Sequence, residues 1–325
     1  MDICFLDNSS VDYTSEDLDS NKLRGAETVL INLSKELYKL GNSVTVYNNC
    51  NNDCILNGVK WINLNNIKSD FIYDISITNN DINLFNKVKS KKYIAISHSI
   101  QSIEKFIRKR QLLNYMKFRP KIVLLSEYHS KNRSILLKLF GTINLEWAID
   151  EIFINTPIND ELIENRAIFT SRNDRNLDLL INIWKNHIYS RNKKTKLFVT
   201  PSSLIDNEFN IYERNFSSRD LLIKDLLKSR VFLIPGHKAE LFCLAAEEAR
   251  ELCIPVVTLG IGSLSERVIH GKTGFIAKNK DEFAKFTLDI IDNNSIWQEL
   301  RDNLIKLRGS KKWSTAASNL LRLIG

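Results

Sequence analysis

Short apolar runs alternate with segments of helical periodicity along most of the 325-residue chain. The run Asp2–Leu6 predicts a strand. After a polar loop, apolar residues recur three or four positions apart up to Gly41, which predicts an amphipathic helix. Further strands are predicted at residues 43–47, 61–64, 73–77, 93–97, 122–126, 167–170 and 196–200, and a further helix at 219–227. Strands that alternate with helices in this way indicate an α/β fold with parallel sheets.

The most informative pattern lies between residues 231 and 276. An apolar run ends at Pro235-Gly236, a polar loop carries Glu240, and a segment with helical periodicity carries Glu248. A second apolar run then ends in a glycine-containing loop at 260–263. This order of strand, loop, helix, strand and loop places ligand-binding groups at the carboxyl ends of parallel strands.

The order of these residues resembles the donor-binding half of retaining GT-B glycosyltransferases of the family 4 type, the glycosyl transferases group 1. That family carries Glu-x7-Glu, a Pro-Val-Val strand, a small-residue loop and a Gly-x-x-Gly turn before phenylalanine or leucine, and the chain matches it from 232 to 276. The resemblance implies a GT-B architecture with two Rossmann-like domains that face each other across a cleft. The expected divisions are an N-terminal acceptor-side domain at 1–152, a nucleotide-sugar-binding domain at 153–310, and a C-terminal helix at 311–325 that packs back toward the first domain.

The resemblance also implies roles at the donor site. Glu240 would bind hydroxyls of the donor sugar and Glu248 the ribose of the nucleotide, because carboxylates accept hydroxyl protons readily. The other residues expected to contribute to donor binding are Gly25, Phe216, Phe242, Gly262 and Ser263. Glu247, which precedes Glu248, is expected to be an ordinary charge on the helix surface.

Two arginines follow the predicted strand 167–170. Arg172 and Arg175 match the two cations that family members carry here, and Asn176 replaces a glycine. Departure of a nucleotide diphosphate builds negative charge on the leaving phosphate, which preorganised guanidinium groups stabilise. Basic residues at a helix start are unfavourable toward the macrodipole, so their position favours a catalytic role over a structural one.

The N-terminal half supplies two further candidates. Arg24-Gly25-Ala26-Glu27 resembles the family's Gly-Gly-Ala-Glu loop, and Gly25 at a helix N-terminus can present N–H groups to a diphosphate. His98 follows the predicted strand 93–97, where family members often have a histidine near the reacting sugar. A structural role for His98 remains the alternative.

Side chains replace several family glycines. Leu241 and Cys243 flank Phe242, and Cys253 precedes the Pro-Val-Val strand. Since glycine lets backbone N–H groups approach phosphate or sugar closely, these side chains would reshape the donor pocket. A sugar-nucleotide-binding protein without turnover, or a GT-B nucleotide-sugar epimerase, is therefore an alternative function.

Charge is unevenly distributed along the chain. The net charge is +8, and residues 87–138 hold 14 Lys and Arg against two Asp and Glu. Within this block, residues 103–121 form a basic amphipathic pattern, which predicts peripheral contact with an anionic membrane or an anionic acceptor. No nucleic-acid recognition motif accompanies the pattern, so a nucleic acid is not expected as a partner.

The remaining composition favours an intracellular enzyme. No apolar run approaches the ~20 residues that span a bilayer, and the apolar start is followed at once by Asp7, which does not fit a secretory signal. Five cysteines argue against a disulfide framework, and Cys50 and Cys54 lack neighbouring metal ligands. A cytoplasmic protein, peripheral at a membrane, is predicted.

The function that follows is retaining transfer of a hexosyl group from a UDP- or GDP-linked sugar to a hydroxyl acceptor, which could be lipid-linked, a glycan or a protein. No metal and no cofactor is expected, because the nucleotide diphosphate sugar is itself the donor substrate. In such enzymes the leaving phosphate is thought to take the acceptor proton on the same face, so no dedicated base is required.

Overall fold

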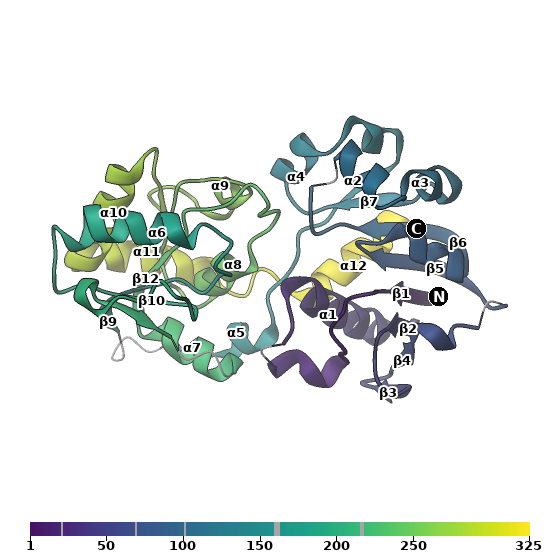
Figure 1. Ribbon diagram of the computed structural model, residues 1–325. Helices are drawn as coiled ribbons and strands as arrows, with labels where there is room; N and C mark the ends of the chain where they lie inside the picture. Colours follow the sequence, from purple (N-terminus) through teal and green to yellow (C-terminus); the bar gives the residue numbers. More distant parts are fainter. Residues whose placement is uncertain (21, 69, 101, 159–162, 215–217) are drawn as a thin grey trace. The chain divides into compact units, whose positions relative to one another are not determined.

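The computed structural model describes residues 1–325 except 21, 69, 101, 159–162 and 215–217 (Figure 1). The chain divides into two compact units, an N-terminal unit of residues 1–148 with 312–325 and a C-terminal unit of residues 149–311. Each unit is a mainly parallel sheet with helices packed on it, so the predicted α/β class with two Rossmann-like parts is confirmed.

The N-terminal unit is built on an eight-stranded sheet in the order β3-β4-β2-β1-β5-β6-β7-β8. Its strands are β1 (Asp2–Leu6), β2 (Ser43–Asn48), β3 (Cys54–Leu56), β4 (Val59–Asn63), β5 (Ile72–Asn79), β6 (Lys89–Ile96), β7 (Lys121–Leu124) and β8 (Thr142–Asn144). All neighbouring pairs are parallel except β3 with β4. The predicted strands of this half are all present, whereas the three-residue strands β3 and β8 were not predicted.

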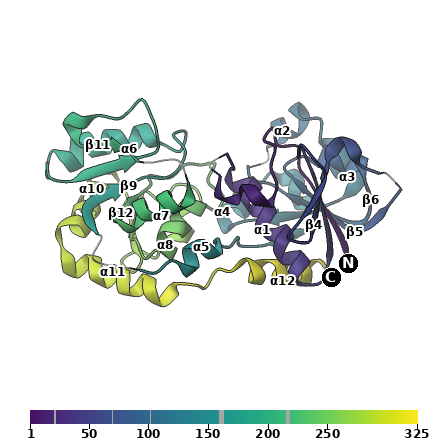
Figure 2. The same ribbon diagram turned by 90° about the horizontal axis from the view of Figure 1, so that it is seen from below.

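Helices cover both faces of this sheet. They are α1 (Gly25–Lys39), α2 (Ile103–Arg108), α3 (Leu112–Phe118), α4 (Glu127–Asn132) and α12 (Trp313–Ile324), with short 3-10 helices η1 (Ser15–Asp19), η2 (Leu64–Asn66), η3 (Ile82–Lys87) and η4 (Ile135–Leu139). Figure 2 shows α12 beside α1, with which it packs. Phe106 of α2 and Tyr115 of α3 join a core cluster with Cys4 and Leu6 of β1.

The predicted amphipathic pattern at 103–121 is divided between two helices. Arg110, between α2 and α3, has a φ of 52°, a left-handed conformation that ends helical geometry. Phe106 and Tyr115 are buried and their rings meet edge to face at 4.8 Å. Ile107 and Leu113, in contrast, are 65% and 82% exposed. Apolar residues of this segment therefore serve both the core and the surface.

The C-terminal unit has a six-stranded, fully parallel sheet in the order β11-β10-β9-β12-β13-β14. Its strands are β9 (Glu164–Ile168), β10 (Lys196–Val199), β11 (Ile211–Glu213), β12 (Ser229–Leu233), β13 (Val256–Thr258) and β14 (Gly274–Ile276). Its helices are α5 (Glu151–Asn155), α6 (Leu177–Ile183) continued by the π-helix η6 (Trp184–Tyr189), α7 (Arg219–Leu227), α8 (Leu244–Glu251), α9 (Leu264–Arg267), α10 (Lys280–Asp292) and α11 (Asn294–Leu307), with the 3-10 turn η7 (Asn207–Phe209).

The order in which the chain adds strands to the C-terminal sheet reverses between β9 and β12. The chain passes from β9 outward to β10 on one side, and from β12 outward to β13 on the other. Ligands of open α/β sheets bind at such a switch point, beyond the carboxyl ends of the strands. The loops after β9 and β12 therefore define where a candidate site should lie.

Candidate active site

Three loops of the C-terminal unit meet at this switch point. Arg172 and Arg175 follow β9, Glu240 follows β12, and Gly262 lies in the loop after β13. The loops are bonded to one another: the Asn176 side-chain amide donates to the carbonyl of Gly236, and the Ser263 N–H donates to the carbonyl of Glu240 at 2.9 Å. The first of these bonds joins residues that are 60 positions apart in sequence.

Arg175 and Glu240 form an ion pair. Arg175 Nε lies 2.6 Å from Glu240 Oε1, and the two side chains are only 17% and 13% exposed. A charge-assisted bond that is largely shielded from water is stronger than a surface pair. The predicted sugar-binding carboxylate and one predicted phosphate-binding cation therefore lie in direct contact.

Arg172 has a different environment. The Arg172 side chain is 53% exposed. Its guanidinium donates two hydrogen bonds to the Asp174 carboxylate, from Nε to Oδ1 at 3.0 Å and from Nη2 to Oδ2 at 2.5 Å. Although burial acts to raise it, the pKa of Asp174 is lowered by the guanidinium groups of Arg172 and Arg175. Both predicted cations are thus paired with carboxylates in this structure.

Glycine is required at position 262, where the loop after β13 packs against the backbone of Glu240. Gly262 has a φ of 77°, and a Cβ there would lie 2.4 Å from the carbonyl oxygen of His237 and 2.9 Å from that of Glu240. Gly262 therefore lets the loop after β13 pack directly on the backbone that carries Glu240. Ser263 is fully buried, and its N–H is engaged by Glu240, so these two residues hold the loop in place.

Glu248 lies on α8 in a separate charged group. Burial raises the pKa of this half-buried carboxyl, while Arg219 and Arg214 oppose that shift and Asp150 adds to it. Arg219 forms an ion pair with Asp150. Sequence reasoning missed these arginines, although Arg219 opens α7 and is as unfavourable toward the helix dipole as Arg172 and Arg175.

The expectation that Glu247 is an ordinary charge on the helix surface is wrong. Glu247 is 1% exposed rather than a surface charge. Its carboxylate lies 2.8 Å from Arg250 Nε, 3.3 Å from Arg267 Nη1 and 2.8 Å from Lys311 Nζ. The helical pattern alone was misleading, because two of the three partners come from distant parts of the chain. Phe242 joins this cluster, with Arg267 and Lys311 stacked over its ring.

Two candidates belong to the N-terminal unit. Gly25 is the first residue of α1, and the Glu27 carboxylate closes that helix start by accepting the Arg24 N–H at 3.1 Å. His98 follows β6, and its ring stacks on Trp147 with 6.2 Å between centroids. Phe216, the remaining candidate, lies outside the described residues.

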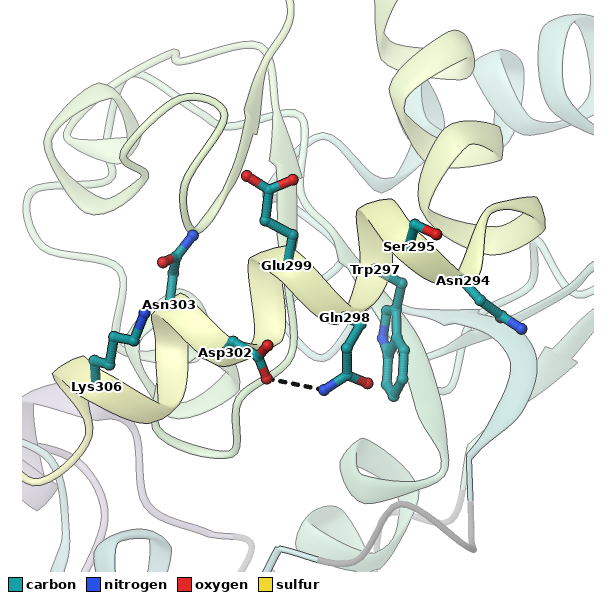
Figure 3. A pocket seen from close by; sticks show the side chains of 8 residues that line it. All are labelled: Asn294, Ser295, Trp297, Gln298, Glu299, Asp302, Asn303 and Lys306. Atoms are coloured by element: carbon teal, nitrogen blue, oxygen red, sulfur yellow. Dashed lines mark hydrogen bonds between the residues drawn. The ribbon is translucent and has the colours of Figure 1, made fainter.

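The hollow drawn in Figure 3 lies apart from these residues. All eight side chains that line it come from α11, and Gln298 Nε2 donates to Asp302 Oδ1 across it at 2.8 Å. It contains none of the predicted site residues and is lined by one helix alone, so we assign it no ligand. Among the described residues, no group of three or more His, Cys, Asp or Glu could hold a metal ion.

Part of the chain matches the model of a known family. Residues 206–308 match the glycosyl transferases group 1. The matched segment contains Glu240, Glu248, Gly262 and Ser263, so the resemblance of residues 232–276 to the glycosyl transferases group 1 is confirmed. No curated protein sequence matches the chain. No helix within the described ranges has the length and apolar character needed to cross a membrane.

Solved structures are similar in fold. Anabaena HepE in complex with UDP-glucose aligns with a TM-score of 0.71 at 14% identity, covering 99% of this chain and 98% of that one. Sucrose-phosphate synthase from Thermosynechococcus elongatus gives 0.69 at 13% identity, with coverage of 99% and 98%. S. aureus TarM gives 0.60 at 16% identity over 77% of this chain, which spans 55% of TarM. The predicted GT-B fold class is confirmed by these alignments.

Proposed function

We propose that this protein transfers a hexosyl group from a UDP- or GDP-linked sugar to a hydroxyl acceptor, with retention of anomeric configuration and without a required metal. The observation that carries the proposal is the shielded Arg175–Glu240 pair at the switch point of the C-terminal unit. The glycosyl transferases group 1 match supports glycosyl transfer. Crystal structures of the similar HepE protein with UDP and UDP-glucose support a nucleotide-linked donor.

In this mechanism the bond between the anomeric carbon and the leaving phosphate breaks while the acceptor oxygen bonds to that carbon. Arg172 and Arg175 stabilise the charge that develops on the diphosphate, and Glu240 orients the sugar through its hydroxyls. The leaving phosphate oxygen takes the acceptor proton on the same face. Glu248 would bind the ribose, and Gly25 and His98 would contact the diphosphate and the reacting sugar.

A binding protein without turnover is the second candidate. Arg172 is held by Asp174, and Arg175 by both Glu240 and Asp174. A donor phosphate must exchange these carboxylates for its own oxygens before either cation can stabilise charge. If the exchange is too costly, the protein would bind a nucleotide sugar and not cleave it.

Calorimetry with UDP and GDP tests the donor site. We expect one of the two to bind, and Arg175→Ala to weaken binding by about 10- to 100-fold, since a charge-assisted contact is lost. Arg191→Ala is the matched control, because Arg191 pairs with Asp281 on the exposed surface of the same unit. Equal affinities for Arg175→Ala and wild type, or no binding of either nucleotide, would contradict the assignment.

A transfer assay with a broad acceptor panel separates the candidate functions. Wild type should consume the donor and form a glycosylated product, Glu240→Ala should abolish transfer, and Glu299→Ala on the exposed face of α11 should leave it unchanged. Nucleotide binding without product would favour the binding protein. Recovery of an epimerised nucleotide sugar would favour an epimerase.

We also propose that the protein binds an anionic membrane surface through α2 and α3 and finds its acceptor there. Exposed apolar side chains in these helices, Ile103, Ile107, Leu113 and Met116, lie among exposed basic residues. Apolar side chains that enter the headgroup region beside cations are typical of interfacial helices. A lipid-linked hydroxyl is the acceptor that this surface fits best.

A further inference from the structure

Three neighbouring strands of the N-terminal unit are followed by rings with unpartnered nitrogens. His98 follows β6, His129 lies on α4 after β7, and Trp147 follows β8. Within the part of the chain that the structure describes, His98 Nε2, His129 Nε2 and Trp147 Nε1 are buried and have no hydrogen-bond partner. Buried polar groups are nearly always hydrogen-bonded, and these three atoms belong to residues that follow adjacent strands.

The three rings are close to one another. Ile96 of β6 pairs with Val123 of β7, so the segments that follow these two strands, which carry His98 and His129, leave the sheet at the same edge. His129 Nδ1 accepts the N–H of Leu125 at 3.4 Å, and His129 lies near enough to His98 to contribute to the lowered pKa of the His98 ring. The Trp147 ring stacks on His98 at 25°.

The protonation states follow from these contacts. Since Nδ1 of neutral His129 accepts a hydrogen bond, its proton is on Nε2. Burial lowers the pKa of both His98 and His129 to about 4, so both are neutral at pH 7. His129 Nε2 and Trp147 Nε1 are therefore donors, and His98 Nε2 is the group of the three that can accept.

We propose that one ordered water joins the three rings, accepting from His129 Nε2–H and Trp147 Nε1–H and donating to His98 Nε2. A buried water typically makes about three hydrogen bonds to otherwise unsatisfied groups. With Nε2 as acceptor, the proton of His98 is on Nδ1, the ring nitrogen that is not among the buried unpartnered atoms. His129 is then a positioning residue that makes His98 Nδ1–H a hydrogen-bond donor for an oxygen of a sugar or phosphate.

The tautomer can be measured directly by two-bond 15N–1H spectra of histidine-labelled protein at pH 7. The chain has five histidines, and the His98 signals are assigned by their loss in His98→Asn. We expect His98 as the Nδ1–H tautomer and His129 as the Nε2–H tautomer. A predominant Nε2–H tautomer for His98 in the wild type overturns the proposal, and this result requires no variant at position 129.

Two amide substitutions test the role of His129. His129→Asn retains an oxygen that can accept the Leu125 N–H but removes the donor at the Nε2 position, whereas His129→Gln places an amide N–H there. The Nδ1–H population of His98 should fall in His129→Asn and persist in His129→Gln. Equal populations in the two variants contradict the positioning role. Trp147→Phe, which keeps the ring, should shift the population in the same direction as His129→Asn.

The functional consequence rests on the proposed glycosyl transfer. If that function holds, kcat should fall about tenfold in His129→Asn, the loss of one hydrogen bond in the transition state, and recover in His129→Gln. The tautomer measurement does not depend on turnover. An Nδ1–H tautomer in a protein that transfers nothing would therefore refute the function and leave the positioning role intact.

Discussion

At the scale of single residues, Glu247 is a buried charge of the C-terminal unit that contacts three cations. It neutralises Arg267, whose side chain is 2% exposed like its own. Glu247→Ala should lower the free energy of unfolding by about 3–5 kcal/mol, because it leaves buried cations without this carboxylate. Urea unfolding measures the change. Glu299→Ala, on the surface of α11, should stay within about 0.5 kcal/mol of wild type, and a similar value for Glu247→Ala would contradict the buried cluster.

Three residues that replace family glycines keep a glycine-like backbone. The φ angles of Asn176, Cys243 and Cys253 are 63°, 62° and 59°, all left-handed. Asparagine tolerates this conformation, whereas cysteine has a Cβ that crowds the backbone there. These three positions therefore combine a left-handed backbone with a side chain that glycine lacks.

At the scale of elements, α1 and α8 end in the same way with different residues. After α8, Cys253 N–H donates to the Arg250 carbonyl and Ile254 N–H to the Ala249 carbonyl, the two bonds of a Schellman motif. Gly41 takes the equivalent position after α1, with a φ of 83°. The sequence predicted the end of α1 from its glycine, and no such signal marks the end of α8.

The Schellman motif predicts that glycine at position 253 gives a more stable protein than alanine does. Cys253→Gly and Cys253→Ala both lose the thiol, but only alanine keeps the left-handed strain. The glycine variant should be more stable by about 1 kcal/mol, opposite to the order in a helix interior. Denaturant unfolding of the pair measures it, and Gly41→Ala should show a loss of similar size. A more stable alanine variant would show that the strain is absent.

The surface of α2 and α3 makes a prediction of its own. Binding to acidic liposomes should weaken steeply with salt, because the Debye length is only ~8 Å at physiological ionic strength. Reversal of Arg108, Lys109 and Arg110 to Glu should release the protein, at about 1 kcal/mol for each cation near the membrane. The same reversal of three exposed cations in the C-terminal unit, Arg191, Lys193 and Lys194, is the control. Liposome binding by the first variant, or none by wild type, would favour a soluble acceptor.

At the scale of the whole molecule, stability should fall in mild acid. Burial lowers the pKa of His98 and His129 from 6.5 to about 4, so the unfolded chain binds more protons between these values. Each histidine contributes stability above pH 6.5 and loses up to about 3 kcal/mol of it as pH falls to 4. Asp7 acts in the opposite sense: burial raises its pKa from 3.8 to about 6, so its contribution grows as pH falls through that window.

The net loss should therefore equal roughly that of one histidine, about 3 kcal/mol between pH 6.5 and 4. Urea unfolding across this range measures it. The double variant His98→Asn with His129→Asn should lose the decline and reveal the rising contribution of Asp7. A flat wild-type profile would contradict neutral, buried histidines.

The sequence by itself determined the α/β class, most strands, the helix Arg219–Leu227 and the order of the site loops, because these depend on local periodicity and on turn residues. It also placed Arg175 and Glu240 at strand ends. Only the tertiary structure decided that the two side chains meet at 2.6 Å, since that contact depends on the order of strands in the sheet.

Burial and pairing were likewise decided by tertiary structure. Glu247 is buried because Arg267 and Lys311 arrive from other elements, and Glu248 lies with Arg214 and Arg219 for the same reason. The strands β3, β8 and β11 have three residues each, too few for a periodic pattern, and exist because neighbouring strands supply their hydrogen bonds. Local sequence patterns predict how strands and helices alternate along the chain. The partners of a buried charge or of a short strand come from segments far away in sequence, so local patterns do not predict them.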